Sequence, residues 1–390
     1  MTNLLVITTL YPNSVQFRHG LFVESRLGRL VESGDYEAVV IAPVPWFPVK
    51  SRYFPQYSQY AQVPEVEERR GITIYHPRYL VIPKIGMVVT PFFLATAILW
   101  AARKLTKLGN RYDLVDAHYY YPDGVAVAMV SRFLGLPFTV TARGSDINLL
   151  SQYTLPRRLI QWAAARAAAS ITVSEALKER LLSLGVRKEK VHVLRNGVDL
   201  EQFMPLDRVR CKDALGAGEC TLLSVGNLVE LKGHDLVIRA MPFLPQCDLL
   251  IVGDGELKDS LERLAVELDV GHRVRFLAAV PQKDLAQIYN AAEILVLASS
   301  REGMPNVVLE AMACDIPVVA TAVGGTPEVV QSPNAGILLQ SRDVDSIVDG
   351  INELLANYPP PGATRRCAES FSWDNTISGL RNLFARIQLQ

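Results

Sequence analysis

The stretch EILVLASSREGMPNVVLEAMACDIPVVAT, residues 293–321, contains the structural unit that predicts the fold. Its apolar start predicts a buried strand that ends just before Arg301. Pro305 suits the first turn of a helix, where its missing N–H is not needed, so a helix is predicted to begin near Met304. A second apolar strand follows. A strand, a helix and a strand in this order predict a parallel sheet covered by helices.

The same alternation extends outward through the whole chain and restarts once. The first half contains the predicted strands LLVITTL, YEAVVIAP, GITIYHP, LVDAH, PFTVTARG, ASITVS and VHVLRNG. After the polar stretch NGVDLEQFMPLDRVR come TLLSVGN, DLLIVGDG, RVRFLAAV, EILVLASS, IPVVATAVGG and AGILLQ. Two doubly wound α/β domains are therefore expected.

The domain limits follow from this restart. We expect a first Rossmann-like domain over 1–197, a hinge over about 197–206 and a second Rossmann-like domain over 206–371. A C-terminal helix over about 372–390 is expected to pack back on the first domain. Ligands of open α/β sheets bind at the carboxyl ends of the strands, so two such domains facing across a cleft could hold a donor and an acceptor.

Composition supports two domains with different partners. Hydrophobic residues make up 49% of the 390 residues, enough for two sizeable cores. The 40 Lys and Arg balance the 40 Asp and Glu, but residues 1–200 hold 24 basic and 15 acidic side chains, a net charge of +9. The remainder carries −9. The basic half lacks the interleaved aromatic residues of an RNA-binding module, so no nucleic-acid partner is expected.

Cysteine usage and the first residues indicate a cellular compartment. The five cysteines form no C-x-x-C pair, which favours a reducing environment without disulfides or structural zinc. The start MTNLLVITTLYPN has neither a basic leader nor a cleavage site and is predicted to form the first strand. A cytoplasmic location is therefore expected. A peripheral position at the inner membrane surface stays open, because the net charge of +9 on the first half would draw it to anionic lipid.

One apolar segment leaves two interpretations open. Residues 85–102, IGMVVTPFFLATAILWAA, precede Arg103, Lys104, Lys107 and Arg111. The segment could be a buried helix with a solvated end, or an apolar, basic-flanked helix that lies on an anionic membrane surface. A transmembrane span is disfavoured by Pro91 and by the short apolar length.

The two glutamates of the opening stretch suggest a sugar-nucleotide site. Glu302 is expected at a strand's carboxyl end, beside free N–H groups at the start of the helix that favour anions such as a diphosphate. Glu310 lies eight residues on, roughly two turns along, where a carboxylate can accept two hydroxyls of a ribose. One glutamate could then hold a hexose hydroxyl and the other the ribose.

This stretch resembles the Glu-x7-Glu signature of retaining glycosyltransferases of family 4 (GT4), which have the GT-B fold. The resemblance covers nearly the whole chain, through TTLYPNSVQFRHGLFVE, DLVDAHYYYPDG, TVTARGSDI, VLRNGVDLEQFMP, SVGNLVELKG, LLIVGDGEL and AVGGTPEVV in the expected order. The N-terminal YPN…FRHGLFVE form is similar to members that build bacterial envelope polysaccharides, including teichuronic-acid-type transferases.

The resemblance implies that the domain over 1–197 binds the acceptor and that the domain over 206–371 binds the nucleotide sugar. It also implies roles for individual residues. Glu302 would contact the donor sugar, Glu310 the ribose, and Lys232 would neutralise the departing diphosphate. His118, at the end of the strand LVDAH, would face the donor sugar. Gly20 would allow the backbone to approach the phosphates. The remaining donor-binding positions would be Asn227, Gly303, Met304, Pro305 and Asn306.

The chain departs from the family pattern at one position. Many members have an arginine at the position of Asn227, and a neutral amide cannot supply that charge to a diphosphate. Lys232 would then carry more of the charge stabilisation, or Arg143 or Arg301 would contribute.

The acceptor side is less defined. His19 lies in a loop where it could contact the acceptor or be merely exposed. Arg143, Ser145 and Asp146 could line the acceptor site, or RGSD could form only a turn with a helix cap.

We therefore expect a retaining, metal-independent transferase without a cofactor. It would move a hexosyl or N-acetylhexosaminyl unit from a UDP- or GDP-linked sugar to a hydroxyl of a lipid-linked or growing envelope polysaccharide. Two alternatives stay open: a nucleotide-sugar epimerase of the same fold, which would need no acceptor, and a non-catalytic sugar-nucleotide-binding subunit, which Asn227 favours.

Overall fold

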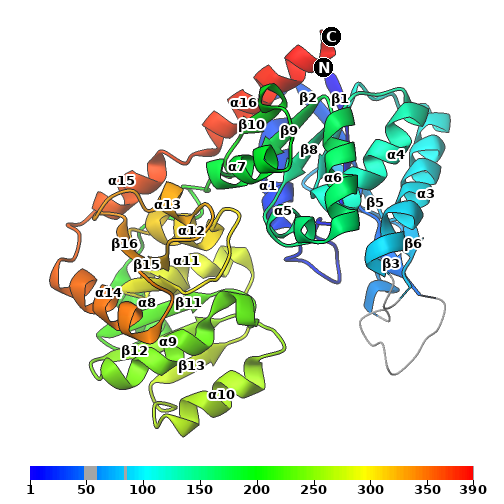
Figure 1. The fold of residues 1–390 in the computed structure, drawn as a ribbon. Coiled ribbons are helices and arrows are strands. Elements are labelled where there is room, and N and C mark those ends of the chain that lie inside the picture. The colour runs from blue at the N-terminus through cyan, green and yellow to red at the C-terminus, as the bar shows by residue number, and fades with distance from the viewer. Residues whose placement is uncertain (48–58, 83–85, 390) are drawn as a thin grey trace. The chain divides into compact units, whose positions relative to one another are not determined.

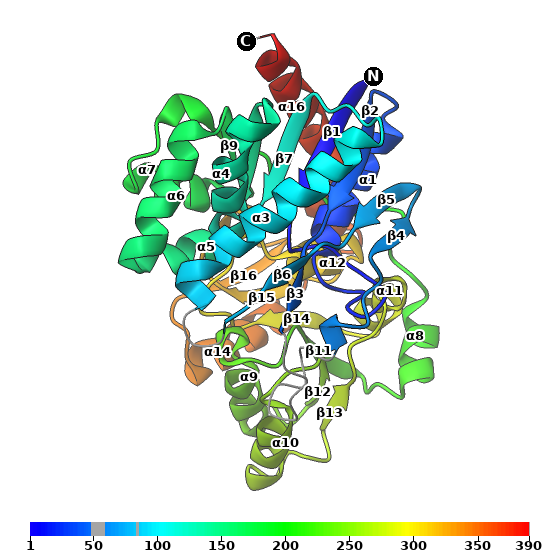
Figure 2. The same ribbon diagram turned by 90° about the vertical axis from the view of Figure 1, so that its right-hand side faces the viewer.

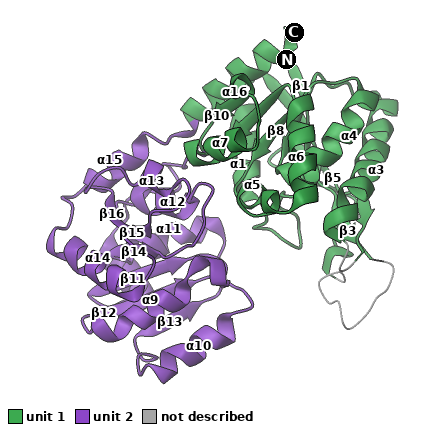
Figure 3. Cartoon of the chain, in the orientation of Figure 1, with its two compact units in different colours: residues 1–195, 374–390 green, residues 196–373 purple. Residues whose placement is uncertain are grey.

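The computed structural model describes residues 1–47, 59–82 and 86–389. These residues form two compact units (Figure 3). Unit 1 comprises 1–195 and 374–390, and unit 2 comprises 196–373. Residues 197–206, expected as a hinge, belong to unit 2. The printed sequence gives unit 1 a total of 26 Lys and Arg against 15 Asp and Glu, and unit 2 a total of 14 against 25.

Unit 1 is built on an eight-stranded sheet with the order β10-β9-β8-β7-β1-β2-β5-β4 (Figure 1). Every neighbouring pair is parallel except β4 and β5. A separate pair, β3 with β6, is also parallel. The strands are β1 (Thr2–Ile7), β2 (Tyr36–Ile41), β3 (Val44–Trp46), β4 (Val66–Arg69), β5 (Ile72–Tyr75), β6 (Arg78–Leu80), β7 (Leu114–His118), β8 (Phe138–Ala142), β9 (Ala169–Thr172) and β10 (Val191–Val193).

The inner strands of unit 1 are buried on both faces, and the helices of the unit connect them. All five residues of β7 and all five of β8 are buried, as expected for a parallel sheet between helical layers. The helices are α1 (Leu21–Glu32), α3 (Gly86–Lys107), α4 (Val125–Leu134), α5 (Ser145–Asn148), α6 (Thr154–Arg166), α7 (Glu175–Ser183) and α16 (Trp373–Gln388).

The C-terminal helix α16 packs on unit 1. The Phe384 ring meets the Tyr36 ring edge-on, with the two centroids 6.1 Å apart. The Gln388 amide lies 3.2 Å from the Thr2 hydroxyl, so the two ends of the chain lie side by side (Figure 1).

Unit 2 has a six-stranded parallel sheet with the order β13-β12-β11-β14-β15-β16. The order runs outward in one direction from β11 and then in the other from β14, as in a doubly wound dinucleotide-binding fold. The strands are β11 (Cys220–Val225), β12 (Cys247–Val252), β13 (Val274–Leu277), β14 (Ile294–Leu297), β15 (Val318–Thr321) and β16 (Gly336–Leu339).

Two helices of unit 2, α8 and α14, begin at an aspartate whose side chain caps the helix. Asp343, for example, accepts the N–H of Ser346 at 2.8 Å and caps the longer of the two. The helices of unit 2 are α8 (Arg208–Leu215), α9 (His234–Ala240), α10 (Lys258–Glu267), α11 (Gln282–Asn290), α12 (Asn306–Ala313), α13 (Thr326–Val329), α14 (Val344–Ala356) and α15 (Ala363–Glu369).

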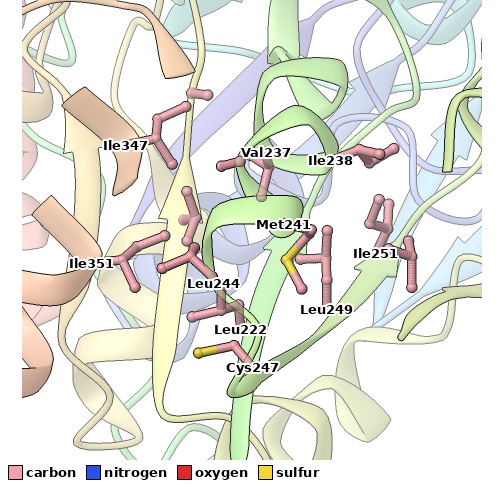
Figure 4. Close-up of a cluster of buried hydrophobic side chains, with 14 of the residues drawn as sticks. Leu222, Val237, Ile238, Met241, Leu244, Cys247, Leu249, Ile251, Ile347 and Ile351 are labelled. Atoms are coloured by element: carbon pink, nitrogen blue, oxygen red, sulfur yellow. The ribbon is translucent and has the colours of Figure 1, made fainter. Parts of the chain in front are cut away.

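One core joins the sheet of unit 2 to α9, α10 and α14 (Figure 4). Leu222 and Leu249 on the strands pack against Val237 of α9 and Ile347 of α14, and all four are fully buried. This packing holds the carboxyl ends of the strands in fixed positions, and those ends carry the candidate site.

The fold class predicted from the sequence is confirmed, and all thirteen predicted strands are present. The prediction missed β3, β4 and β6. These strands have only three or four residues, and their sequences VPW, VEER and RYL are too short or too polar to form the apolar run that marked the others.

Candidate active site

The strand order of unit 2 reverses between β11 and β14, and ligands of such sheets bind at the carboxyl ends beside that reversal. Asn227 follows β11, Lys232 ends the short turn that begins at Glu230, and Glu302 follows β14. The fold thus brings together Lys232 and Glu302, which are 70 positions apart in the sequence.

An ion pair joins these two residues. Lys232 Nζ lies 2.6 Å from Glu302 Oε1, and both side chains are largely buried. The loops that carry them are also tied together, because Ser300 N–H donates to the Leu231 carbonyl at 2.8 Å. A partly buried ammonium group at this position can bind a phosphate, and the paired carboxylate can accept a hydroxyl.

A third loop, which follows β15, packs against the backbone of Glu302. Gly324, after β15, has φ +54°, and a Cβ there would lie 1.9 Å from the Glu302 carbonyl oxygen. Only glycine allows so close a backbone approach at that φ. The AVGGTPE motif that was noted in the sequence therefore fixes the Glu302 loop.

The residues after Glu302 lead into α12. Met304 and Pro305 are buried, Gly303 is half-buried, and Pro305 immediately precedes the helix. The helix begins at Asn306, two residues later than expected, because Pro305 is still non-helical with ψ 89°. Asn306 Oδ1 accepts from Asn196 Nδ2 at 3.0 Å.

Glu310 lies four residues into α12, one helical turn rather than the two expected. It is 9% exposed. Tyr289 Oη donates to its Oε2 at 2.8 Å, and Gln282 Nε2 donates to its Oε1 at 3.3 Å. Burial raises the pKa of Glu310 to about 7, although both hydrogen bonds oppose the rise. Each oxygen can still accept a further hydroxyl.

Sequence reasoning missed Tyr289 and Gln282. A signal existed, since the two residues are seven positions apart in α11 and therefore lie on one face of that helix.

The positions with the least support are Asn227 and Arg301. Both side chains are exposed. The cation that the structure places beside Glu302 is Lys232.

In unit 1 the strand order reverses between β1 and β7, and His118 is the last residue of β7. It lies in a buried charged cluster. Arg26 Nη2 donates to Asp116 Oδ2 at 2.7 Å, and Thr139 Oγ1 donates to Asp116 Oδ1 at 2.8 Å. His118 Nε2 lies 3.3 Å from Asp116 Oδ2, and Arg143 Nη2 lies 2.5 Å from His118 Nδ1.

These contacts define the state of His118. Because a guanidinium can only donate, Nδ1 accepts, and Nε2 carries the proton that it shares with Asp116. Burial lowers the pKa of His118 to about 3 in spite of the carboxylate of Asp116, so the ring is neutral at pH 7. Burial opposes ionisation of Asp116, but Arg26 and His118 outweigh it and lower its pKa.

His118 was expected to face a donor sugar, and that role stays a prediction. Its side chain is 1% exposed, and both ring nitrogens are engaged inside unit 1. Asp116, two residues earlier on the same strand face, was not singled out from the sequence, although the spacing of two was a signal for it.

Around Arg143, the RGSD segment leads from β8 into the short helix α5, which begins at Ser145. Asp146 is fully buried and accepts the backbone N–H groups of Tyr120 at 2.8 Å and Gly144 at 2.8 Å. It therefore offers no surface to an acceptor. Ser145 is exposed and its Oγ lies 2.7 Å from Tyr119 Oη. The Arg143 guanidinium lies 4.9 Å from the Phe22 ring centroid.

The loop after β1 carries His19 and Gly20. Gly20 has φ +74°, and a Cβ there would lie 2.3 Å from the Leu10 carbonyl oxygen. Glycine is thus required by the loop itself, and not only by the phosphate approach that was expected. His19 is exposed, and its Nε2 lies 3.1 Å from the Thr9 carbonyl.

The triplet Asp343–Val344–Asp345 has the spacing of a two-carboxylate metal motif, but Asp343 caps α14. Across residues 1–47, 59–82 and 86–389, no group of three or more His, Cys, Asp or Glu side chains could hold a metal ion. Metal independence remains an expectation.

Comparisons with known proteins cover both units. Residues 57–202 match the family model "Glycosyltransferase Family 4", and residues 209–370 match "Glycosyl transferases group 1". TuaC of Bacillus subtilis, named as a teichuronic acid biosynthesis glycosyltransferase, is 30% identical over 89% of this chain and 88% of its own length. A D-inositol 3-phosphate glycosyltransferase of Mycobacterium marinum is 37% identical over 71% of this chain and 64% of its own length.

Among solved structures, HepE of Anabaena in complex with UDP-glucose aligns with a TM-score of 0.74 at 19% identity, over 99% of this chain and all of that chain. This likeness, with the topology of the two sheets, confirms the expected GT-B type of fold.

Proposed function

Since the chain belongs to the nucleotide-sugar-dependent glycosyltransferases with a family 4 and a group 1 domain, we propose that it transfers a hexosyl or N-acetylhexosaminyl unit with retention and without a metal. The donor would be a UDP- or GDP-linked sugar. The acceptor would be a hydroxyl of a lipid-linked or growing envelope polysaccharide, which the similarity to TuaC supports.

The observation that carries the proposal is the ion pair of Lys232 and Glu302 at the strand-order reversal of unit 2. An ammonium group has three donor hydrogens, so Lys232 can bind a diphosphate while it still contacts Glu302. As the bond to the sugar breaks, negative charge develops on the diphosphate, and Lys232 stabilises that charge together with the free N–H groups at the start of α12. These groups would supply the charge that a metal supplies elsewhere.

Glu302 and Glu310 would share the recognition of the donor. The pairing with Lys232 keeps Glu302 in place to accept a sugar hydroxyl. Glu310, aimed by Tyr289 and Gln282, would accept the two ribose hydroxyls. This division gives each glutamate a different partner and explains why one of them precedes the helix and the other lies within it.

We propose a front-face displacement for the chemical step. The acceptor hydroxyl attacks the anomeric carbon from the side of the leaving group, and its proton passes to the departing diphosphate oxygen. His118 has no place as a direct contact in this scheme because its ring is buried. It would act as a positioning residue that holds the Arg143 guanidinium through Nδ1.

The experiment combines donor binding with turnover. Thermal shifts with UDP, GDP, ADP and dTDP sugars, with and without EDTA, would identify the donor. Release of the nucleotide would then be followed with and without a lipid-linked acceptor. The proposal expects acceptor-dependent release that EDTA leaves unchanged, and that Glu302→Gln and Lys232→Met each reduce at least 100-fold.

Other outcomes would identify the alternatives. Conversion of the donor without an acceptor would indicate an epimerase. Binding without turnover against any acceptor would indicate a non-catalytic subunit, which is the reading that the neutral, exposed Asn227 favours.

A further inference from the structure

Helix α3 lies on the outside of unit 1 (Figure 2). It exposes several large apolar side chains to solvent. Val88, Phe92 and Trp100 recur at multiples of four residues, so they lie along one face, and Phe92 and Trp100 are 54% and 64% exposed. The opposite face carries Leu94 and Ile98, which are fully buried. Large aromatic side chains in a row on an exposed face usually mark an interaction site.

Two hollows adjoin α3, and Thr96, Trp100 and Lys104 line both. The first has a volume of about 530 Å³ and lies between α3 and the strands β3 to β6. Its walls include Trp46, itself 46% exposed, and Phe93. The second has a volume of about 490 Å³ and is lined by residues of α3 and by Leu108, which follows the helix.

The second hollow is basic. Arg103, Lys104 and Lys107 line it, and Arg111 follows in the sequence. Residues 86–112 contain no acidic residue, and Glu65 lines the first hollow. Lys104 Nζ lies 5.3 Å from the Trp100 ring centroid, so the apolar and the basic parts meet at this pair. An apolar surface that joins a basic one suits a partner with apolar chains and anionic head groups.

We propose that this surface, the α3 face (Val88, Phe92, Trp100, Arg103, Lys104 and Lys107, with Trp46), docks on a bilayer that contains anionic lipid. Phe92, Trp100 and Trp46 would enter the head-group region, where amphipathic aromatic rings are stable. The three basic side chains would contact lipid phosphates.

The helix would lie on the membrane and not cross it. By length and composition α3 is the one helix of the described residues that could span a bilayer, and 39% of its most apolar 18-residue window is buried within the molecule. A span would have to remove Leu94 and Ile98 from the core of unit 1, whereas docking leaves that core intact.

The proposal goes beyond the proposed transfer reaction and is tested without turnover. Full-length protein would be floated with vesicles of phosphatidylcholine alone and with 30% phosphatidylglycerol. We expect binding to the anionic vesicles, weakened by 0.5 M salt because screening shortens the reach of the basic side chains. Equal binding to both vesicle types, or binding to neither, would overturn the proposal.

Paired variants locate the surface. The double substitution Phe92→Ser and Trp100→Ser should reduce vesicle binding at least about 10-fold, since each substitution removes apolar surface that the bilayer would bury. Arg103→Gln, Lys104→Gln and Lys107→Gln together should reduce it by about 100-fold, at about five-fold per charge. The matched controls, Phe133→Ser on α4 and Phe243→Ser in unit 2, alter equally exposed rings elsewhere and should change nothing.

Circular dichroism melts of every variant check that the fold is retained. Equal losses in the control variants would refute the assignment to the α3 face. So would a chain that sediments as a dimer, ignores vesicles and becomes monomeric with Trp100→Ser, because the partner would then be a second copy of the chain.

Discussion

Replacing Glu310 by glutamine should make the free protein more stable at alkaline pH while it impairs donor binding. Burial raises the pKa of Glu310 from 4.5 to about 7. In the unfolded chain the group ionises near pH 4.5, but in the folded chain it holds its proton until about pH 7. The contribution of Glu310 to the free energy of unfolding therefore falls as the pH rises from 4.5 to 7, and it is lowest above pH 7.

The size of the effect follows from that interval. A shift of about 2.5 pH units corresponds to about 3 kcal/mol. Glutamine cannot ionise, so the free energy of unfolding of Glu310→Gln does not fall in this way as the pH rises. At pH 5 both proteins should behave alike apart from a constant offset, and by pH 8 the variant should have gained about 2–3 kcal/mol. For a domain of this size the gain corresponds to a rise in Tm of roughly 5–10 °C.

Thermal melts of both proteins at pH 5, 6, 7 and 8 would measure the difference, with exposed Glu353→Gln on α14 as the matched control. The same samples at pH 8 should show nucleotide-sugar affinity at least about 10-fold weaker in Glu310→Gln, because a carboxylate that accepts hydroxyls has been lost. A stability difference that stays constant from pH 5 to 8, or full donor affinity in the variant, would refute the reasoning.

Three further predictions concern Lys232 and Gly324 beside Glu302 in unit 2 and the buried Asp116 of unit 1. Lys232→Met removes the cation beside Glu302 and should lower nucleotide-sugar affinity about 10-fold or more in a titration; unchanged affinity would remove Lys232 from the site. Asp116→Asn leaves the buried Arg26 guanidinium without its carboxylate and should lower the free energy of unfolding by about 3–5 kcal/mol, seen as a Tm roughly 10 °C lower. A Tm within about 2 °C of the unsubstituted protein, roughly the scatter of such measurements, would contradict the role of the buried cluster. Gly324→Ala should displace the Glu302 loop and lower transfer activity, whereas Gly185→Ala, which has a similar positive φ and open space, should leave activity intact; equal activities would show that the contact is not needed.

The sequence was informative where the signal was local. The strand LVDAH was predicted with its observed limits, since five buried residues in a row reflect a strand covered on both faces. The Glu302–Pro305–Glu310 spacing likewise led to a strand end and a helix, because proline and the apolar run act over a few residues.

It was uninformative where the environment comes from distant residues. His118 looked available at a strand end, but Arg26 and Arg143, which lie 92 and 25 positions away, enclose it. The pKa of Glu310 likewise depends on the fold, since burial raises it and Tyr289, 21 positions earlier, opposes the rise. Burial and partner geometry are tertiary properties, and residue spacing does not encode them.

The path of the chain between the units has a consequence for how such enzymes diversify. The chain leaves unit 1 after Arg195 and returns at Asp374. Within unit 1, Thr376 donates to the Arg195 carbonyl, and within unit 2 the Val198 N–H donates to the Phe371 carbonyl at 2.9 Å. The first and last segments of unit 2 are therefore adjacent. The two positions of unit 1 at which the chain leaves and returns are adjacent as well. Unit 2 is therefore a domain inserted into unit 1. A genetic exchange with two junctions could replace the whole of unit 2, while the hydrogen bond between Thr376 and Arg195 would still join the two segments of unit 1.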